Sequence, residues 1–188
     1  MNVNILGEET VTEQELPEYM YKNLKPSLKM NRNVTKETLE NGIVKKEKLY
    51  HPMWIVKMLI IADRKPFPPK VKPNMAFIDA VSGYRGLFPN VPPINEKEVS
   101  ESKVKKARIT KQDLLSKYVV NIQEKQINRN YILKKPRYEI KETSIVYLPL
   151  WEVEVDTKYL TKTFVINGNT GESENLLYDL WQSGEWML

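Results

Sequence analysis

In the segment 150–156, hydrophobic and acidic residues alternate strictly from Trp151 to Asp156. The hydrophobic positions are Trp151, Val153 and Val155, and the acidic positions are Glu152, Glu154 and Asp156. A period of two with one hydrophobic face is typical of a half-buried strand. Looser alternation of the same kind predicts strands at 42–50, 53–62 and 137–147.

Helical spacing replaces this alternation after Thr110. The hydrophobic positions there recur at intervals of three and four, and they are Leu114, Leu115, Tyr118, Val119 and Ile122. Because threonine is a favoured N-cap residue, the pattern predicts a helix that begins at Thr110 and covers a sheet with one face. An earlier helix is expected after Thr12, where Glu15 completes a capping box and Pro17 requires the helix to start immediately before it.

One block of sequence occurs twice, with a spacing of 97 residues. The first copy contains Tyr50, Pro52, Trp54 and Val56, and the second contains Tyr147, Pro149, Trp151 and Val153. Each copy continues into a hydrophobic strand and a turn, which ends at Gly83 in the first copy and at Gly171 in the second. A supersecondary unit that recurs in sequence predicts one local structure used twice, so we expect an internal duplication.

The duplication predicts an α+β fold in which each unit is a helix packed on a three- to four-stranded antiparallel sheet. We expect the first unit at 1–94, a charged linker at 95–109 and the second unit at 110–188. The first unit also holds the proline-rich basic segment Arg64–Pro73, which we expect to be a stiff loop. The second unit ends in a short amphipathic helix with the hydrophobic residues Leu176, Leu177, Leu180 and Trp181.

A family resemblance rests on two parts of the first copy. The segment Tyr50–Val56 reads Tyr-x-Pro-x-Trp-x-Val, and the strand after it ends in Phe77–Gly83, which reads Phe-Ile-Asp-Ala-Val-Ser-Gly. This arrangement resembles the small PepSY and cystatin-like domains, and the resemblance covers most of each repeat. The second copy departs from it, with Asn167 and Gly168 at the Asp-Ala position. Such domains are generally non-catalytic binding, inhibitory or regulatory modules, and the resemblance implies that role here.

The composition excludes several kinds of chemistry. The chain of 188 residues has no cysteine, which excludes disulfides, thiolate metal sites and a cysteine nucleophile. His51 is the single histidine, and its counterpart in the second copy is Leu148, so we expect a semi-exposed packing position in place of a general base. No hydrophobic run is long enough to cross a bilayer, and the N-terminus lacks the features of a secretory signal, so we expect a soluble, cytoplasmic protein.

The formal charge of +5 is divided among four basic stretches that lie between acidic ends of the chain. The basic stretches are 22–36, 45–48, 64–72 and 103–111. Separate clusters of lysine and arginine are usually solvated surface, and this interpretation is favoured. If the clusters met on one face, the protein would be a nucleic-acid-associated accessory protein, which is the alternative hypothesis.

Carboxylates support a third hypothesis. Glu152, Glu154 and Asp156 lie on one predicted strand face and could bind a divalent cation, as in a carboxylate-based hydrolase or a metal enzyme. Lys158 and Lys162 are close enough in sequence to neutralise them, so we expect neither a metal nor a cofactor. The side chains at the two predicted turns, Asp79 and Asn167 with Ser82 and Thr170, are expected to bond to the backbone and not to a ligand.

These observations favour a non-catalytic binding or regulatory module that contacts a protein or peptide partner. The contact is expected at a sheet edge, at the proline-rich loop or at the hydrophobic C-terminal tail. We expect the tail either to fold back on the sheet of the first copy or to dock on another chain, which could be a second copy of this protein. The residues predicted to bind are Phe67, Tyr84, Arg85, Trp181, Trp186, Met187 and Leu188.

Overall fold

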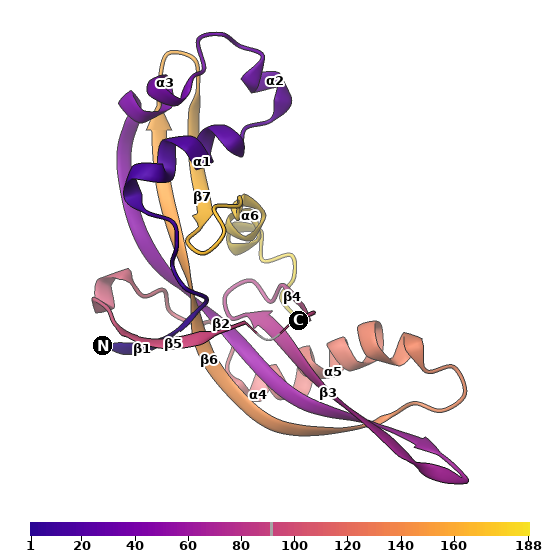
Figure 1. The fold of residues 1–188 in the computed structure, drawn as a ribbon. Helices are drawn as coiled ribbons and strands as arrows, with labels where there is room; N and C mark the ends of the chain where they lie inside the picture. The colour runs from indigo at the N-terminus through magenta and orange to yellow at the C-terminus, as the bar shows by residue number, and fades with distance from the viewer. Residues whose placement is uncertain (91) are drawn as a thin grey trace. The chain divides into compact units, whose positions relative to one another are not determined.

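Strands dominate the computed structural model, which describes residues 1–90 and 92–188 (Figure 1). The strands are β1 (Asn2–Leu6), β2 (Ile43–Arg64), β3 (Phe67–Asp79), β4 (Arg85–Leu87), β5 (Ile94–Glu98), β6 (Arg137–Asp156) and β7 (Thr161–Asn167). They form one sheet in the order β4-β3-β2-β6-β1-β5, and β7 pairs with β6. Because β1 pairs with β6 in parallel at Ile5 and Tyr147 whereas the hairpins are antiparallel, the sheet is mixed. The predicted α+β class is confirmed.

The helices are short, apart from one long helical segment. In the N-terminal half they are η1 (Glu13–Glu15), α1 (Leu16–Lys22), α2 (Pro26–Lys29) and α3 (Lys36–Asn41). η2 (Glu101–Lys103) is a separate turn. The segment 111–130 is helical throughout and comprises α4 (Lys111–Asp113), η3 (Leu114–Tyr118), α5 (Val119–Ile122), η4 (Gln123–Ile127) and η5 (Asn128–Asn130). α6 (Asn175–Ser183) is the predicted C-terminal helix.

Local sequence explains where two of these helices begin. Pro17 lies in the first turn of α1, where its missing N–H is not needed, and the Glu15 carboxylate accepts from the backbone N of Thr12 at 2.9 Å. The Thr110 side chain accepts from the backbone N of Asp113 at 3.1 Å. The predicted starts of both helices are therefore confirmed.

The chain divides into two compact units, and each unit combines segments that are distant in sequence. Unit 1 comprises 1–51, 93–105 and 147–182, and unit 2 comprises 52–92, 106–146 and 183–188. The strands β2 and β6 contribute to both units, since the division falls within each of them. The sequence segments 1–94 and 110–188 are therefore each distributed over both units.

In unit 1, the N-terminal helices pack on the hairpin β6–β7. Leu16 and Met20 of α1 are fully buried, and they share a core with Trp151, Val153 and Phe164 of the hairpin. The carboxylates between these hairpin residues lie on the other face of β6, as the alternation predicts. Helices from the first half of the chain thus cover strands from the second half.

Unit 2 has the converse arrangement, in which the helical segment 111–130 packs on the hairpin β2–β3. Leu114, Tyr118 and Ile122 are buried against the hairpin, and the hairpin contributes Trp54, Val56, Met58, Ile60, Ala76 and Ile78. Leu115, which belongs to the predicted hydrophobic stripe, is 37% exposed and lies outside this core. A helix from the second half of the chain thus covers strands from the first half.

Equivalent hydrogen bonds join helix and hairpin in the two units. In unit 2 the indole Nε1 of Trp54 donates to the carbonyl oxygen of Ile109 at 2.9 Å, and in unit 1 the indole Nε1 of Trp151 donates to that of Val11 at 3.2 Å. The backbone N of Ile109 donates to the oxygen of Ala80 at 2.9 Å, and the backbone N of Val11 donates to that of Gly168 at 2.9 Å. The same three positions of the repeat are therefore joined in both units, by one indole bond and one backbone bond in each.

The turns after β3 and β7 also match. Gly83 and Gly171 have φ angles of +79° and +73°, which residues with a side chain rarely adopt, and each donates to the residue four positions earlier at 2.9 Å. The Asp79 carboxylate accepts from the backbone N of Val81 at 2.7 Å, and the Asn167 amide oxygen accepts from that of Asn169 at 2.9 Å. Both side chains bond to the turn, as predicted.

The segment Arg64–Pro73 is not a loop. β2 and β3 remain paired as far as Arg64 and Phe67, so the segment forms the end of a long hairpin. β4 pairs with β3 at 76–78, and among the described residues no strand pairs with the far side of β3 at the hairpin end. Prolines are tolerated on such an edge because half of its backbone N–H groups have no strand to bond, and the expected loop is therefore replaced by a strand.

Candidate binding sites

Five of the seven predicted binding residues lie together in unit 2, around the guanidinium of Arg85. This side chain is 9% exposed and extends from β4 at the edge of the sheet. Its Nη1 donates to the oxygens of Gly83 at 2.7 Å and Trp186 at 2.9 Å, and its Nε donates to Oδ1 of Asn121 at 2.9 Å. Burial lowers the pKa of Arg85 from its ordinary value. The bonded partners are neutral, so they orient the cation without neutralising it.

The C-terminal tail packs beside Arg85. The Trp186 ring meets the Tyr84 ring edge to face at 5.1 Å, and the Met187 sulfur lies 3.6 Å from the hydroxyl of Tyr118. The backbone N of Leu188 donates to the same hydroxyl at 3.0 Å. The tail therefore folds back within unit 2, one of the two alternatives that the sequence predicts, although its three hydrophobic side chains stay partly exposed.

Trp181 is not part of this cluster and is buried in unit 1. The His51 imidazole stacks on its indole with ring centroids 4.3 Å apart and planes 14° apart, and the Lys105 Nζ lies 3.7 Å from the centroid. His51 is fully buried, so the prediction of a semi-exposed position is wrong. Stacking on an aromatic ring gives the imidazole a favourable place within the core. Leu176 is 60% exposed and is not part of the buried stripe of α6.

Phe67 also lies apart from the Arg85 cluster. It is 68% exposed near the end of the β2–β3 hairpin in unit 2. That end meets the loop after η5: Lys134 donates to the Asp63 carboxylate at 2.7 Å, and Arg137 donates to it at 3.3 Å. The predicted basic stretch 64–72 is thus adjacent to the segment 129–137. This segment is also basic, but it is not one of the four stretches predicted from the sequence.

A groove of about 570 Å³ lies in unit 2, between β2, β3 and the residues after β4. Leu59, Met75 and Phe88 supply hydrophobic surface, and the lysines that line it are Lys57, Lys72 and Lys141. In the alternation of β2, Lys57 and Leu59 lie between the residues that contact the helical segment, so they belong to the opposite face. Lys57 donates to Glu142 at 2.7 Å, and Lys141 is bonded to Glu139. The groove therefore combines hydrophobic surface with partly neutralised lysines.

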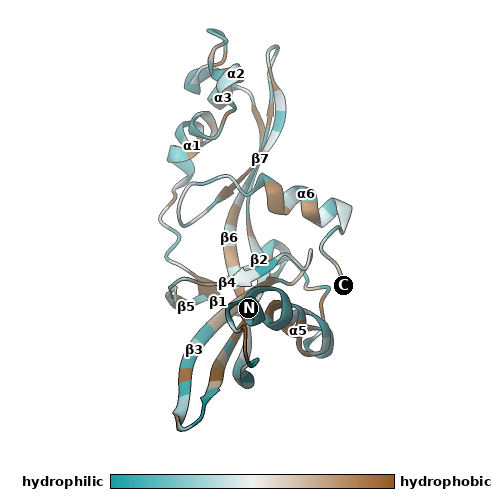
Figure 2. Cartoon of the chain, turned by 90° about the vertical axis from the view of Figure 1, so that its right-hand side faces the viewer, coloured by the Kyte–Doolittle hydropathy of each residue, from teal (hydrophilic) through white to brown (hydrophobic). Residues whose placement is uncertain are grey.

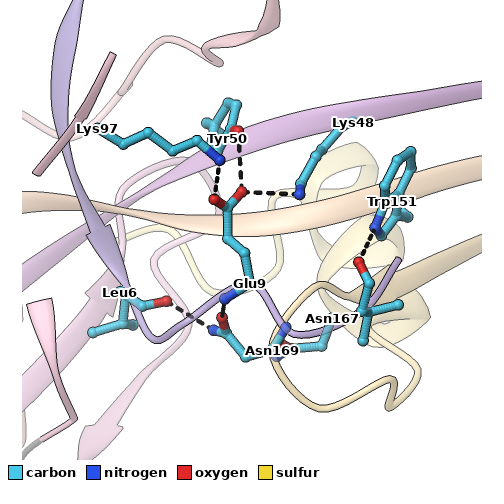
Figure 3. A network of polar contacts seen from close by, with 9 residues as sticks. Leu6, Glu9, Lys48, Tyr50, Lys97, Trp151, Asn167 and Asn169 are labelled. Atoms are coloured by element: carbon cyan, nitrogen blue, oxygen red, sulfur yellow. Dashed lines mark hydrogen bonds and ion pairs between the residues drawn. The ribbon is translucent and has the colours of Figure 1, made fainter. Parts of the chain in front are cut away.

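A polar network centred on Glu9 lies in unit 1 (Figure 3). The Glu9 carboxylate accepts from the Tyr50 hydroxyl at 3.0 Å and contacts Lys48 at 3.0 Å, and Lys97 also bonds to it. The Glu9 backbone has a φ of +48° and donates to the amide oxygen of Asn169 at 2.9 Å. A non-glycine residue in this left-handed conformation requires support from its surroundings, which Asn169 supplies.

Two opposing effects set the pKa of Glu9. Burial raises it, but the bonds from Lys97, Lys48 and Tyr50 together outweigh burial, and the pKa lies below its ordinary value. Burial and the adjacent carboxylate raise the pKa of Tyr50. The bond to Glu9 raises the pKa of Lys97. With these pKa directions, Glu9, Tyr50 and Lys97 keep their usual charges at neutral pH. The network joins the segment after β1 to β2 and β5.

Carboxylates on β6 form ion pairs with Lys45, a different lysine from the Lys158 and Lys162 suggested by the sequence. Lys45 Nζ lies 3.5 Å from Glu154 and 4.0 Å from Glu152. Within residues 1–90 and 92–188, no three His, Cys, Asp or Glu side chains are grouped so that they could hold a metal ion. Among the helices of the described residues, none is long and hydrophobic enough to span a bilayer.

Comparison of the chain with family models, with curated proteins and with solved structures found no match. The resemblance to PepSY and cystatin-like domains therefore stays a prediction. The functional argument rests on the geometry of the sites described above.

Sequence reasoning missed the Glu9 network and the groove. Glu9 lies in an acidic N-terminal stretch with no local pattern, and its partners come from three other segments, so no spacing could have revealed the network. The groove had a detectable signal, because Leu59 places a hydrophobic side chain on the face of β2 to which the polar Lys57 belongs.

Proposed function

We propose that this protein is a non-catalytic binding module and that the groove in unit 2 receives a side chain of a protein or peptide partner. The groove carries the proposal because it presents hydrophobic side chains on the sheet face that the helical segment leaves uncovered. Its volume of about 570 Å³ is within the range of sites that hold a small ligand or a few side chains. Its lining combines hydrophobic side chains, lysine amines and the Asn74 amide, which can contact both hydrophobic and polar groups of a peptide.

The lining also indicates the chemistry of the partner. Leu59, Met75 and Phe88 favour a hydrophobic anchor, and methionine adapts its shape to the group it contacts. Lys72 lies at the same groove and is exposed, so a carboxylate next to the anchor would gain a favourable contact. The proposed ligand is therefore a peptide segment with a hydrophobic residue flanked by an acidic one.

A displayed library of random peptides tests this proposal. We expect selection on the full chain to enrich hydrophobic residues next to Asp or Glu, and the enriched peptides to lose binding to a Leu59→Glu variant. Leu176→Glu, at a position 60% exposed in unit 1, is the matched control and should bind as the native chain does. Thermal unfolding of both variants verifies that they fold. Equal binding to the native chain and to Leu59→Glu would refute the assignment of the groove.

We also propose that the two units descend from one duplicated segment whose copies exchanged their helices. The matched bonds from Trp54 and Trp151 support this, since the residues joined are equivalent in the sequence repeat but come from opposite halves of the chain. The registers agree as well: Trp54 pairs with Ile78, and Trp151 pairs with Ile166. A PepSY or cystatin-like origin of the repeated segment is part of this proposal.

A further inference from the structure

The free end of the β2–β3 hairpin and the loop beside it form a surface that the proposed groove does not include. We define this tip surface as residues 62–72 and 129–137 of unit 2. The two segments are adjacent, because they line a common hollow and Asp63 bonds to Lys134 and Arg137. Figure 2 shows hydrophobic and hydrophilic bands interleaved along the hairpin.

The tip surface is strongly cationic. Each of its two segments carries four lysines or arginines, and Asp63 is the one carboxylate in either sequence. Lys134 and Arg137 neutralise Asp63, which lowers the pKa of that carboxyl. Arg64 and Lys135 donate to backbone carbonyl oxygens, which orient these cations without neutralising them. The surface therefore attracts anions.

The same surface exposes large hydrophobic side chains. The exposed fractions are 93% for Ile132, 101% for Leu133, 68% for Phe67 and 53% for Val71. Ile132 and Leu133 are consecutive and project from the loop with almost no contact to the rest of the chain. Such side chains are costly to leave in water when two adjoin each other.

We propose that the tip surface docks on a phospholipid bilayer with anionic headgroups. Hydrophobic side chains that project from a loop can insert into the soft interface of a bilayer, whereas a protein partner would need matching pockets for them. Lysines and arginines around the inserted residues attract anionic lipid. Nucleic acid would complement the charge, but three of the four exposed hydrophobic side chains, Ile132, Leu133 and Val71, have no ring on which a base could stack, and Phe67 alone has one.

Vesicles of phosphatidylcholine, with and without phosphatidylserine, provide the test. Because the chain has no cysteine, Leu133→Cys gives a single site for an environment-sensitive fluorophore. Met30→Cys is the matched control, since Met30 is a hydrophobic residue 83% exposed in unit 1. We expect the label at 133 to brighten and shift to shorter wavelength with phosphatidylserine vesicles at low salt, and the label at 30 to stay unchanged.

Two sets of unlabelled variants separate insertion from charge. Replacing Ile132 and Leu133 together by serine should weaken sedimentation with phosphatidylserine vesicles by at least about tenfold. Lys65→Gln and Lys70→Gln should each weaken it by about fivefold. Met30→Ser should have no effect. All of these positions are exposed, so the variants are expected to fold as the native chain does.

Three results would overturn the proposal. The first is no sedimentation with phosphatidylserine vesicles at low salt. The second is sedimentation with the vesicles while the label at 133 keeps the emission intensity and wavelength that it has in water. The third is binding of a single-stranded or duplex oligonucleotide by a chain that leaves vesicles unbound, which would assign the cations to nucleic acid.

Discussion

The Trp151 indole of unit 1 and the Trp54 indole of unit 2 make the same bond to the chain just before a helix, at 3.2 and 2.9 Å. Beyond this shared centre the units differ. The hairpin of unit 1 ends at Asp156 and Thr161, whereas that of unit 2 continues to Arg64 and Phe67 and ends in cations. The recurring contacts hold helix to sheet, and the differing parts carry the proposed binding surfaces.

The largest effect is expected from removing the shared indoles. Trp54→Ala and Trp151→Ala should each lower the free energy of unfolding by about 3–5 kcal/mol, because both residues are buried in a core. Urea unfolding measures the loss. Phenylalanine at either position keeps most of the ring and should cost about 1 kcal/mol through the lost hydrogen bond. A large loss at one tryptophan and none at the other would break the equivalence of the units.

Alanine at the turn glycines should have the next largest effect. A Cβ on Gly83 would lie 2.7 Å from a Tyr118 carbon, and one on Gly171 would lie 2.0 Å from a Tyr19 carbon. With the positive φ at both, each variant should lose about 1–3 kcal/mol of stability in thermal unfolding. Gly184 also has a positive φ, but a Cβ there meets nothing within 4 Å, so Gly184→Ala should cost less. An equal loss at all three would assign the cost to φ alone.

Glu9 distinguishes the units, because its network is formed in unit 1. Glu9→Gln should lower stability at neutral pH by about 1–2 kcal/mol, since Lys48 and Lys97 lose their shared carboxylate. Chemical unfolding measures the difference. Glu18→Gln is the control, because Glu18 forms an exposed pair with Lys36 and should change stability little.

The effect of Glu9 should depend on pH in a defined direction. Its folded-state pKa lies below the ordinary value of 4.5, so the stabilisation is present above that value and is lost as pH falls through the folded pKa. The stabilities of the native chain and Glu9→Gln should therefore converge in acid. A difference that is constant from neutral pH to strong acid would contradict the ionic account of the network.

The smallest effect is expected at the tail. Trp186→Ala removes a ring whose centroid lies 5.5 Å from the Arg85 guanidinium and should cost about 0.5–1 kcal/mol. Deleting 185–188 tests the separate prediction that the tail controls self-association or partner binding. Sedimentation velocity and peptide capture measure both. If the deletion changes neither the hydrodynamic size nor peptide capture, the tail has no role in self-association or partner binding and serves only as a contact within unit 2.

Local sequence was sufficient for the starts of α1 and the 111–130 helix, and for the buried face of β6. A threonine cap, a proline and a period of two act over a few residues, so they can be interpreted without the fold. Five predicted binding residues also meet around Arg85, because the turn after β3 is short and the tail is hydrophobic.

Contacts between distant segments could not be predicted in this way. Nothing local indicates that α1 covers a hairpin more than a hundred positions away, or that Glu9 meets Lys97. The proline-rich segment was misleading because proline disfavours strands in general, whereas the open side of β3 tolerates it. The burial of His51 depends on Trp181, which comes from α6.

Nuclear Overhauser contacts of the indole protons test the central claim most directly, namely that each unit joins a helix from one half of the chain to a hairpin from the other. Tryptophan-to-phenylalanine variants would assign the signals of the four tryptophans. We predict contacts from the Trp151 indole N–H to Val11 and from the Trp54 indole N–H to Ile109. Contacts of Trp54 with Val11 and of Trp151 with Ile109 would show that each half folds on itself and would contradict the account.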